Sequence, residues 1–299
     1  MARVLFNFFD DWSDELAWWL GLTLGDGNVH RGKKYYRVSL CGTFETTSRW
    51  LALFAPERRP MEFKNSPGTF QATVDSKQLV ELCESQFGMV GPKADSLPWP
   101  VSLPKKHRRA FIRGLWDSDG SLSVDMREGR RGGPCCRAKY TTATHDFAVQ
   151  LQKLVRTCIP SMSDVKVSRW TTPLGKFKTQ RTWYSFVWNG LNAWRLARWL
   201  YRDAPEALRN EDKYNAYLRF EALRGEEYER RIIVERRMKK HRAENAARLA
   251  EFWSDGQPLK DGADKVCKQC GSLQLKAKGL CESCYKKEWR RCRKQVGGR

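Results

Sequence analysis

The chain has 299 residues, of which 41% are hydrophobic and 13 are Trp, so it has enough apolar material for about two or three folded domains. Lys and Arg number 55 against 34 Asp and Glu, and the formal net charge of +21 favours nucleic acid as the partner over an anionic membrane or no polyanion at all. No apolar run approaches the roughly 18 residues of a membrane-spanning helix, and no cleavable signal is evident, so we expect a protein that is not secreted and is located in prokaryotic or phage-associated cytoplasm or an organelle matrix.

The first predicted element is a helix that ends at Gly25-Asp26-Gly27. A helical period is formed by residues that recur at steps of three and four, namely Leu16, Trp19, Leu20, Thr23 and Leu24. A strand is predicted in "KKYYRVSLCGTF", because apolar residues alternate there with basic and polar ones. The apolar set is Tyr36, Val38, Leu40 and Phe44, and the other set is Lys33, Tyr35, Arg37, Ser39 and Thr43. A helix over "ETTSRWLALFA", a hairpin over "MEFKNSPGTFQATV" and a helix ending near Gly88 complete this series.

The same order of elements returns after Asp119. A short strand is predicted at "SLSVD", a longer one at "CCRAKYTT" and a helix at "HDFAVQLQKLV". A hairpin over "VKVSRWTTPLGKFKTQRTWYSFVW" and a helix over "GLNAWRLARWL" follow. We assign the order helix-strand-strand-helix-strand-strand-helix to both series, although only one strand is located before the second helix of the first series. This repetition predicts an α+β fold made of two equivalent αββαββα repeats.

The remaining third of the chain differs in composition. A long, charged and mostly helix-forming stretch follows the second repeat, and then come a linker and a cysteine-rich tail. We predict four parts: residues 1–104 and 105–220 as the two repeats, 221–264 as a basic helical extension and linker, and 265–299 as a small separate unit.

The two helices that end on Asp-Gly predict a metal site. Gly21 and Gly25 lie four residues apart, as do Gly114 and Ser118 in the second helix, and small residues at this spacing allow helices to approach closely. If the helices pack together, Asp26 and Asp119 lie side by side at the same end. Two carboxylates so placed repel unless a cation lies between them, and the negative ends of the helix dipoles add to its attraction. Oxygen ligands suit Mg²⁺, whose bound water can attack a phosphodiester. For either motif alone, a helix stop or turn is the alternative.

The two segments "WLGLTLGDG" and "IRGLWDSDG" resemble the LAGLIDADG motif of homing endonucleases. The resemblance extends over roughly residues 13 to 217, and the run "GPKADSLPWPVSLPKKHRRAFIRGLWDSDGSL" carries it most specifically. The first motif has Leu24 where the second has Asp117. The resemblance implies a single-chain pseudo-dimer in which the motif helices form the interface and two saddle-shaped antiparallel sheets sit on DNA.

The resemblance also implies roles for individual residues. Asp26 and Asp119 would bind the catalytic Mg²⁺, and the backbone carbonyls of Gly25 and Ser118 are further candidate ligands. A basic residue is expected near each active centre, and the matches are Lys93 and, less directly because the repeats differ in length, Lys213; a surface lysine is the alternative for each. Polar residues that hold water are expected near the end of the second strand of each repeat, where Glu45 and Thr144 lie.

The alternating strands provide candidate DNA contacts independently of the resemblance. A two-stranded ribbon fits the major groove, where basic side chains read base edges. The candidates are Arg31, Lys33, Arg37, Arg137, Lys139, Lys178 and Arg181. The alternative is the ordinary solvated face of a half-buried sheet.

The C-terminal cysteines predict a structural zinc site. Cys267 and Cys270 form one C-x2-C pair, Cys281 and Cys284 form another, and four thiolates complete a tetrahedral Zn²⁺ shell. A redox pair is the alternative, but it would not explain two pairs in a segment too short to fold around its own core. Basic residues surround the pairs, so we expect this zinc finger-like tail to contact DNA, with a protein contact as the alternative.

These observations together predict a monomeric, site-specific double-strand DNA endonuclease that uses Mg²⁺ at Asp26 and Asp119 and Zn²⁺ in its tail. An intron-encoded homing endonuclease is the specific form that the resemblance implies. A maturase of the same fold that binds intron RNA and assists splicing is the main alternative. A DNA-binding regulator with a degenerate copy of the fold is disfavoured because both acids are present.

Overall fold

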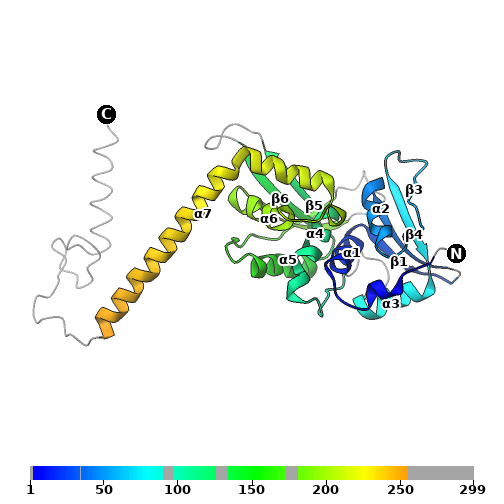
Figure 1. Cartoon of the computed structure of the whole chain (residues 1–299), viewed down its shortest axis with the longest axis horizontal. Helices are drawn as coiled ribbons and strands as arrows, with labels where there is room; N and C mark the ends of the chain where they lie inside the picture. The colour runs from blue at the N-terminus through cyan, green and yellow to red at the C-terminus, as the bar shows by residue number, and fades with distance from the viewer. Residues whose placement is uncertain (1–2, 34, 90–96, 126–133, 173–180, 255–299) are drawn as a thin grey trace, which may run out of the picture. The chain divides into compact units, whose positions relative to one another are not determined.

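The computed structural model describes residues 3–33, 35–89, 97–125, 134–172 and 181–254 (Figure 1). The chain divides into two compact units, Met1–Arg231 and Ile232–Arg299. The predicted tail with Cys267, Cys270, Cys281 and Cys284 lies outside the described residues, as do Lys93 and Lys178.

The first unit contains the two repeats with the predicted order of elements. The first repeat consists of α1 (Asp14–Gly25), β1 (Gly27–Arg31), β2 (Tyr36–Gly42), α2 (Phe44–Ala52), β3 (Met61–Glu62), β4 (Phe70–Asp75) and α3 (Lys77–Phe87). The second consists of α4 (Arg108–Ser118), β5 (Gly120–Asp125), β6 (Cys135–Thr142), α5 (His145–Cys158), β7 (Ser168–Thr171), β8 (Thr182–Asn189) and α6 (Leu191–Tyr201). Short 3₁₀ turns lie at Phe6–Phe9, Lys105–His107 and Glu206–Leu208, and α7 (Glu211–Ser254) follows.

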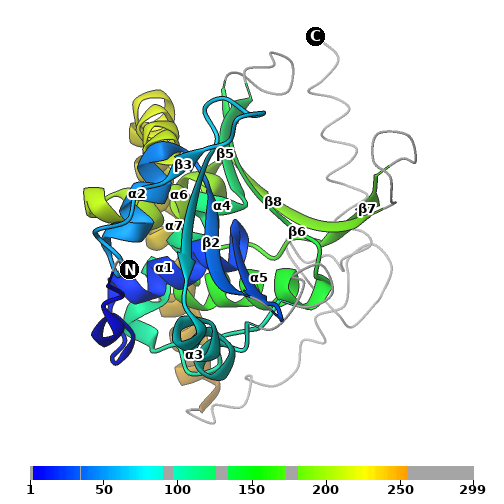
Figure 2. The same ribbon diagram turned by 90° about the vertical axis from the view of Figure 1, so that its right-hand side faces the viewer.

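Each repeat forms one antiparallel sheet of four strands, in the order β1-β2-β4-β3 and β5-β6-β8-β7. The registers are equivalent, since Gly27 pairs with Leu40 in the first sheet and Gly120 pairs with Tyr140 in the second. Figure 2 shows the strands β6 and β8 curving away from the helices that cover the sheets. The predicted α+β fold of two αββαββα repeats is therefore confirmed. The strand β1 was not singled out in the sequence because its apolar alternation is short.

Local sequence explains where the helices of the first repeat begin and end. The side chains of Ser13, Thr43 and Ser76 accept hydrogen bonds from backbone N–H groups in the first turns of α1, α2 and α3. Gly88 ends α3 with a positive φ of 65°, a conformation that glycine adopts without a steric penalty. Gly68, in the Pro-Gly turn before β4, has a φ of 79° for the same reason.

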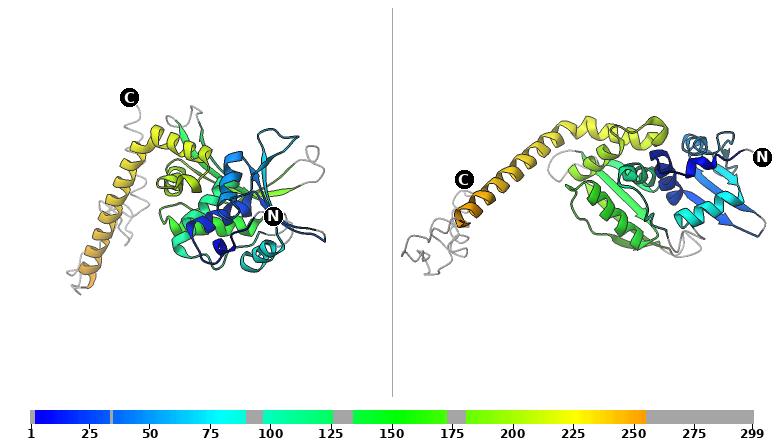
Figure 3. Two further views of the ribbon diagram at one scale, coloured as in Figure 1. Left: turned by 45° about the vertical axis from the view of Figure 1, so that its right-hand side comes forward. Right: turned by 60° about the horizontal axis from the view of Figure 1, so that its bottom comes forward.

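The core centres on α1 of the first repeat and α4 of the second, which pack against each other where the two repeats meet (Figure 3). Helix α1 is buried on every side from Leu16 to Leu24, as expected for a helix that is apolar all round. Trp19 stacks on Trp50 of α2 with ring centroids 5.9 Å apart. Trp116 of α4 stacks on Trp188 of β8 at 6.3 Å in the second repeat. Each central helix is therefore held by its own sheet layer and by the other central helix.

Helix α7 begins beside the second repeat and continues into the second unit. It runs from Glu211 to Ser254, so the predicted division at residue 220 falls inside a helix. In the first unit its residues Tyr217, Phe220 and Tyr228 are buried, and Tyr228 contacts Trp194 of α6 edge to face. Within the described part of the chain, no helix combines the length and apolar composition that crossing a bilayer requires.

Candidate active site

The two central helices touch through their glycines. A Cβ atom at Gly21 would lie 2.8 Å from the backbone nitrogen of Leu115 and would overlap the carbonyl oxygen of Phe111. A Cβ atom at Gly114 would lie 3.0 Å from the backbone nitrogen of Leu22 and would overlap the carbonyl oxygen of Trp18. Any side chain at either position therefore meets rigid backbone of the facing helix, so the close approach of α1 and α4 depends on both glycines.

The acids follow the two helices in nearly identical conformations. Asp26 has φ and ψ of −89° and −6°, and Asp119 has −87° and −8°. Their backbone N–H groups donate to the carbonyl oxygens of Leu22 at 2.9 Å and Leu115 at 3.1 Å. Asp119 Oδ2 lies 3.4 Å from where a Cβ atom at Gly25 would stand. The structure thus brings the carboxylate of one motif beside the backbone of the other, at the same end of the helix pair.

The glycines after the acids serve a different purpose from the one that the sequence suggests. Gly27 and Gly120 do not have the positive φ of a helix-capping glycine. A Cβ atom at Gly27 would lie 2.7 Å from the Cα atom of Thr23, and one at Gly120 would lie 2.5 Å from the ring of Trp116. At both positions, glycine lets the chain turn directly from the helix into the next strand while it packs against the last helical turn.

Of the two predicted basic residues, Lys213 is the one that the described residues show near Asp119. It lies in the first turn of α7, and its Nζ atom donates to the carbonyl oxygen of Gly120. Burial lowers the pKa of this ammonium group, while the carboxylates of Asp117, Asp26 and Asp119 act in the opposite direction. Lys213 is therefore close enough to interact electrostatically with both predicted metal ligands.

Tyr140 is a site residue that sequence reasoning missed. Its side chain is buried, and its hydroxyl group has no hydrogen-bond partner among the residues that the structure describes. Burial raises the pKa of Tyr140 well above its ordinary value, and the carboxylates of Asp119 and Asp26 raise it further. The equivalent residue of the first sheet is Leu40, which has no hydroxyl group. The only sequence signal was this difference at matching positions of the two repeats.

Asp117 is a second residue whose position was not anticipated. It is 5% exposed and accepts hydrogen bonds from Trp18 Nε1 at 2.8 Å and Tyr201 Oη at 2.6 Å. Burial raises the pKa of this carboxyl to about 6, against the opposing effect of the two bonds and of nearby Arg113. Since Leu24 stands at the matching place in α1, only α4 has this acid. Asp117 joins α1, α4 and α6 and does not belong with Asp26 and Asp119, which are exposed and half-buried respectively.

The predicted DNA contacts fall on two faces. Arg37, Arg137 and Lys139 lie in the alternation of β2 and β6 that is opposite to the buried residues. Arg37 forms an ion pair with Asp75 at 2.7 Å, and the Lys139 ammonium lies 5.9 Å from the ring centroid of Trp170. Lys33 and Arg181 are exposed beside these strands.

Arg31 does not lie with the others. It continues the alternation of buried Gly27 and Val29 in β1, and its guanidinium pairs with Glu84 at 2.5 Å and Glu81 at 3.9 Å on α3. The half-exposed Arg31 therefore lies beside α3, on the face of the sheet opposite to Arg37, and its contact with DNA stays a prediction.

Ser118, Glu45 and Thr144 were also predicted to lie near the site, and the structure gives the first two side chains local partners. Ser118 Oγ donates back to the carbonyl oxygens of Gly114 at 3.2 Å and Leu115 at 3.0 Å. Glu45 forms an ion pair with Arg49 at 2.7 Å. The Thr144 hydroxyl is buried and has no hydrogen-bond partner within the described ranges.

The side chains present fit a divalent cation. Two carboxylates converge at the carboxyl ends of two helices, and oxygen donors of this kind suit Mg²⁺ and similar ions. The buried hydroxyl of Tyr140, which has no hydrogen-bond partner among the described residues, interacts electrostatically with both acids. In the part of the chain that the structure describes, no group of three or more His, Cys, Asp and Glu gathers around a common centre.

Comparison with known sequences finds similarity in the second repeat. Residues 106–162 match the model of the LAGLIDADG-like domain family, and this segment includes α4, Asp119 and α5. Over 124 residues, or 40% of this chain, the sequence is 31% identical to the replication factor C small subunit of Methanocaldococcus jannaschii. The match spans only 6% of the length of that relative.

Comparison with solved structures finds distant similarity to homing endonucleases. The homing endonuclease I-DmoI in complex with DNA and Ca is 14% identical, with a TM-score of 0.42 over 65% of this chain and 95% of that one. Meganuclease I-SmaMI bound to uncleavable DNA is 11% identical, with a TM-score of 0.42 over 68% and 86%. The LAGLIDADG homing endonuclease I-LtrWI bound to target DNA is 10% identical, with a TM-score of 0.38 over 61% and 80%.

Proposed function

We propose that this protein is a site-specific double-strand DNA endonuclease of the LAGLIDADG type that depends on a divalent metal ion. The observation that carries the proposal is the convergence of Asp26 and Asp119 at the ends of two helices that pack through Gly21 and Gly114. The net charge of +21 and the LAGLIDADG-like match of residues 106–162 support the same conclusion.

The acids and Lys213 have different roles in the proposed reaction. Asp26 and Asp119, with the backbone carbonyls of Gly25 and Ser118, would hold the cation. A bound Mg²⁺ would supply a water of lowered pKa and would stabilise the leaving oxygen. Lys213 places a positive charge beside Gly120, where it offsets the negative charge that develops on a phosphate during cleavage.

The polar faces of the two sheets bind DNA. Arg37, Arg137 and Lys139 lie on them, and Lys33, Lys178 and Arg181 extend the basic surface in our proposal. Side chains in this alternation are spaced to follow base edges and phosphates along a major groove. Each sheet would read one half of a long asymmetric site, because the two repeats present different side chains.

The C-terminal tail is proposed to bind one structural Zn²⁺ through Cys267, Cys270, Cys281 and Cys284. This proposal rests on the spacing of the cysteines alone. The tail would add phosphate contacts, and the protein would act as a monomer, because a single chain contains both repeats.

The test separates binding from cleavage. Sites cleaved by the wild-type protein are selected from a random DNA library in Mg²⁺, and Asp26→Asn and Asp119→Asn are then compared on a selected site. We expect both variants to bind DNA and to lose cleavage. Asp146→Asn, which removes an exposed acid at the start of α5, is the matched control and should cleave normally.

Two results would contradict the proposal. Cleavage retained by both variants would refute the assignment of the acids. Absence of cleavage by the wild type, together with tight binding to folded intron RNA, would identify a maturase instead.

A further inference from the structure

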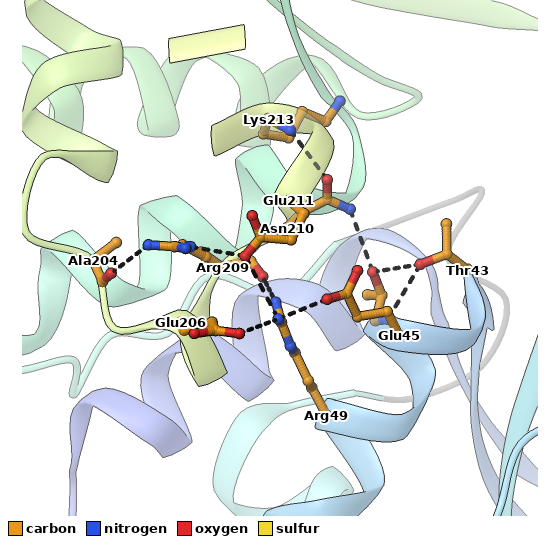
Figure 4. Close-up of polar contacts among 10 residues, drawn as sticks. Thr43, Glu45, Arg49, Ala204, Glu206, Arg209, Asn210, Glu211 and Lys213 are labelled. Atoms are coloured by element: carbon orange, nitrogen blue, oxygen red, sulfur yellow. Dashed lines mark hydrogen bonds and ion pairs between the residues drawn. The ribbon is translucent and has the colours of Figure 1, made fainter. Parts of the chain in front are cut away.

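The segment between α6 and α7, residues 202–210, leads to Lys213 and contacts the first repeat. It follows the second repeat in the sequence, but it contacts helix α2 of the first repeat. One such contact joins Arg49 to Arg209, which lie far apart in the chain (Figure 4). We call residues 202–210 the connector. Its position determines where α7 begins and therefore where Lys213 lies.

Arg49 of α2 makes the main contact with the connector. Its guanidinium donates to the carbonyl oxygen of Arg209 at 2.5 Å and lies 3.8 Å from Glu206 and 3.6 Å from Glu211. Glu45, one turn earlier in α2, holds the same guanidinium at 2.7 Å. The side chain of Arg49 is 15% exposed, but Glu45 and Glu206 are 51% and 78% exposed, so their ion pairs with Arg49 are weak surface interactions. The charge-assisted bond to the part-buried carbonyl of Arg209 is therefore the contact that holds the connector.

Asn210 makes a second contact that reaches Lys213 directly. Its Oδ1 atom accepts the backbone N–H of Lys213 at 3.2 Å and thereby caps the first turn of α7. Its Nδ2 atom donates to Thr46 Oγ1 of α2 at 3.3 Å. Thr46 Oγ1 also accepts a bond from the hydroxyl of Thr43 at 3.0 Å, which fixes the acceptor in place (Figure 4).

The opposite side of the connector is fixed to α4. Arg113 is buried, and it donates to the carbonyl oxygens of Leu208 at 2.6 Å and Leu200 at 3.2 Å. The connector is therefore held between α4 of its own repeat and α2 of the other one. Of these two contacts of the connector, the one with α2 joins the two repeats.

We propose that Arg49 and Asn210 are positioning residues for Lys213, so that helix α2 of the first repeat holds the basic residue of the second active centre. This inference rests on the proposed function in assigning Lys213 to phosphodiester cleavage. It also has a consequence that a purely structural role would lack. Loosening the α2 contact displaces Lys213 from Gly120 and should slow cleavage of one DNA strand more than the other.

The variants separate the contact from general stability. Arg49→Ala removes the bonds to the connector, and Thr46→Val removes the acceptor of Asn210 with little change of volume. Arg49→Lys keeps one donor and the positive charge and should restore much of the loss. Arg224→Ala is the matched control, because Arg224 also joins a backbone carbonyl (Pro134) and an acid (Glu227) but lies in α7 beyond the connector.

Two measurements are made on each full-length variant. The first is hydrogen–deuterium exchange of peptides that span the connector and Lys213, which does not depend on catalysis. The second is cleavage of a selected DNA site labelled on each strand. In Arg49→Ala and Thr46→Val we expect exchange to accelerate about tenfold, the factor for losing one hydrogen bond, and nicked DNA to accumulate. Arg224→Ala should leave both readouts near wild type.

The outcomes distinguish this inference from the proposed function. If the wild type cleaves both strands and the α2 variants slow both equally, the positioning role of Arg49 and Asn210 is wrong while the nuclease stands. If the wild type cleaves no DNA in any divalent metal, the proposed function fails, and the exchange measurement then decides the connector contact alone. Unchanged exchange in both α2 variants would overturn the inference in either case.

Discussion

Replacing Gly114 by Ala adds one methyl group where α1 and α4 are closest. The new Cβ atom would lie 3.0 Å from the backbone nitrogen of Leu22 and 3.1 Å from the Cα atom of Gly21, and would overlap the Trp18 carbonyl. None of these backbone atoms can rotate away, so the helices must separate by on the order of 1 Å to restore contacts near 3.5 Å. Overpacking of this kind costs about 1–3 kcal/mol.

The same substitution at Gly225 is the control. A Cβ atom there would meet Glu221 Oε2 at 2.6 Å, which is the end of a side chain that can move. Both substitutions gain helix propensity of about 1 kcal/mol, so the difference between the variants isolates the clash. At about 2–4 °C for each kcal/mol, the unfolding midpoint of Gly114→Ala should lie roughly 2–12 °C below that of Gly225→Ala.

Function should respond more strongly than stability. A displacement of about 1 Å between Asp26 and Asp119 is expected to reduce cleavage roughly 100-fold at temperatures where the variant is folded. Thermal unfolding followed by circular dichroism gives the midpoints, and cleavage of a selected DNA site gives the rates. Equal midpoints for the two variants, with equal cleavage, would refute the close approach of the two helices as the basis of the site.

Three further predictions concern the sheet face, the buried acid and the tail. Asp75→Asn removes the partner of Arg37 and should steepen the salt dependence of DNA binding by about 0.9 in slope, measured by titration at several salt concentrations; an unchanged slope would contradict a DNA role for Arg37. The pKa of Asp75 is held below its ordinary 3.8 by Arg37, so the stabilisation by this exposed pair, about 0.2–1 kcal/mol, is present above that pH and is lost as the pH falls through the lowered pKa. Tyr201→Phe removes a hydrogen bond to buried Asp117 and should lower the free energy of unfolding by about 1.5–3 kcal/mol, as measured by urea denaturation; no loss would show that the bond contributes nothing net. Cys270→Ser should reduce the zinc content measured by mass spectrometry from one equivalent toward zero, and wild-type protein free of zinc would exclude the proposed site.

The order of elements and the positions of the two acids could be read from the sequence because they depend on local patterns. The continuous apolar run before Asp26 and the two-residue period around Val38 identify a helix and a strand without any long-range information. Repetition of the same order after Asp119 then predicts two equivalent halves, and the small residues Gly21 and Gly114 predict a close pair of helices.

The surroundings of individual side chains depend on how the helices and strands pack together, and local sequence patterns do not predict this packing. Tyr140 lies in an ordinary apolar alternation, and only the packed fold places its hydroxyl near Asp26 and Asp119. In the sequence Arg31 is close to the basic residues Lys33 and Arg37, but its position in the alternation of β1 turns it toward α3.

The sequence by itself determined the duplicated fold, the pair of acids and the basic strands that lie beside them. Tertiary structure alone decided that Asp117 is buried between Trp18 and Tyr201, and that Arg49 of the first repeat holds the segment leading to Lys213 of the second. The physical reason is that hydrogen bonds between residues far apart in the chain form only after both central helices are packed. Periodicity along the chain does not predict which distant carbonyl or carboxylate group will form a hydrogen bond with a buried side chain.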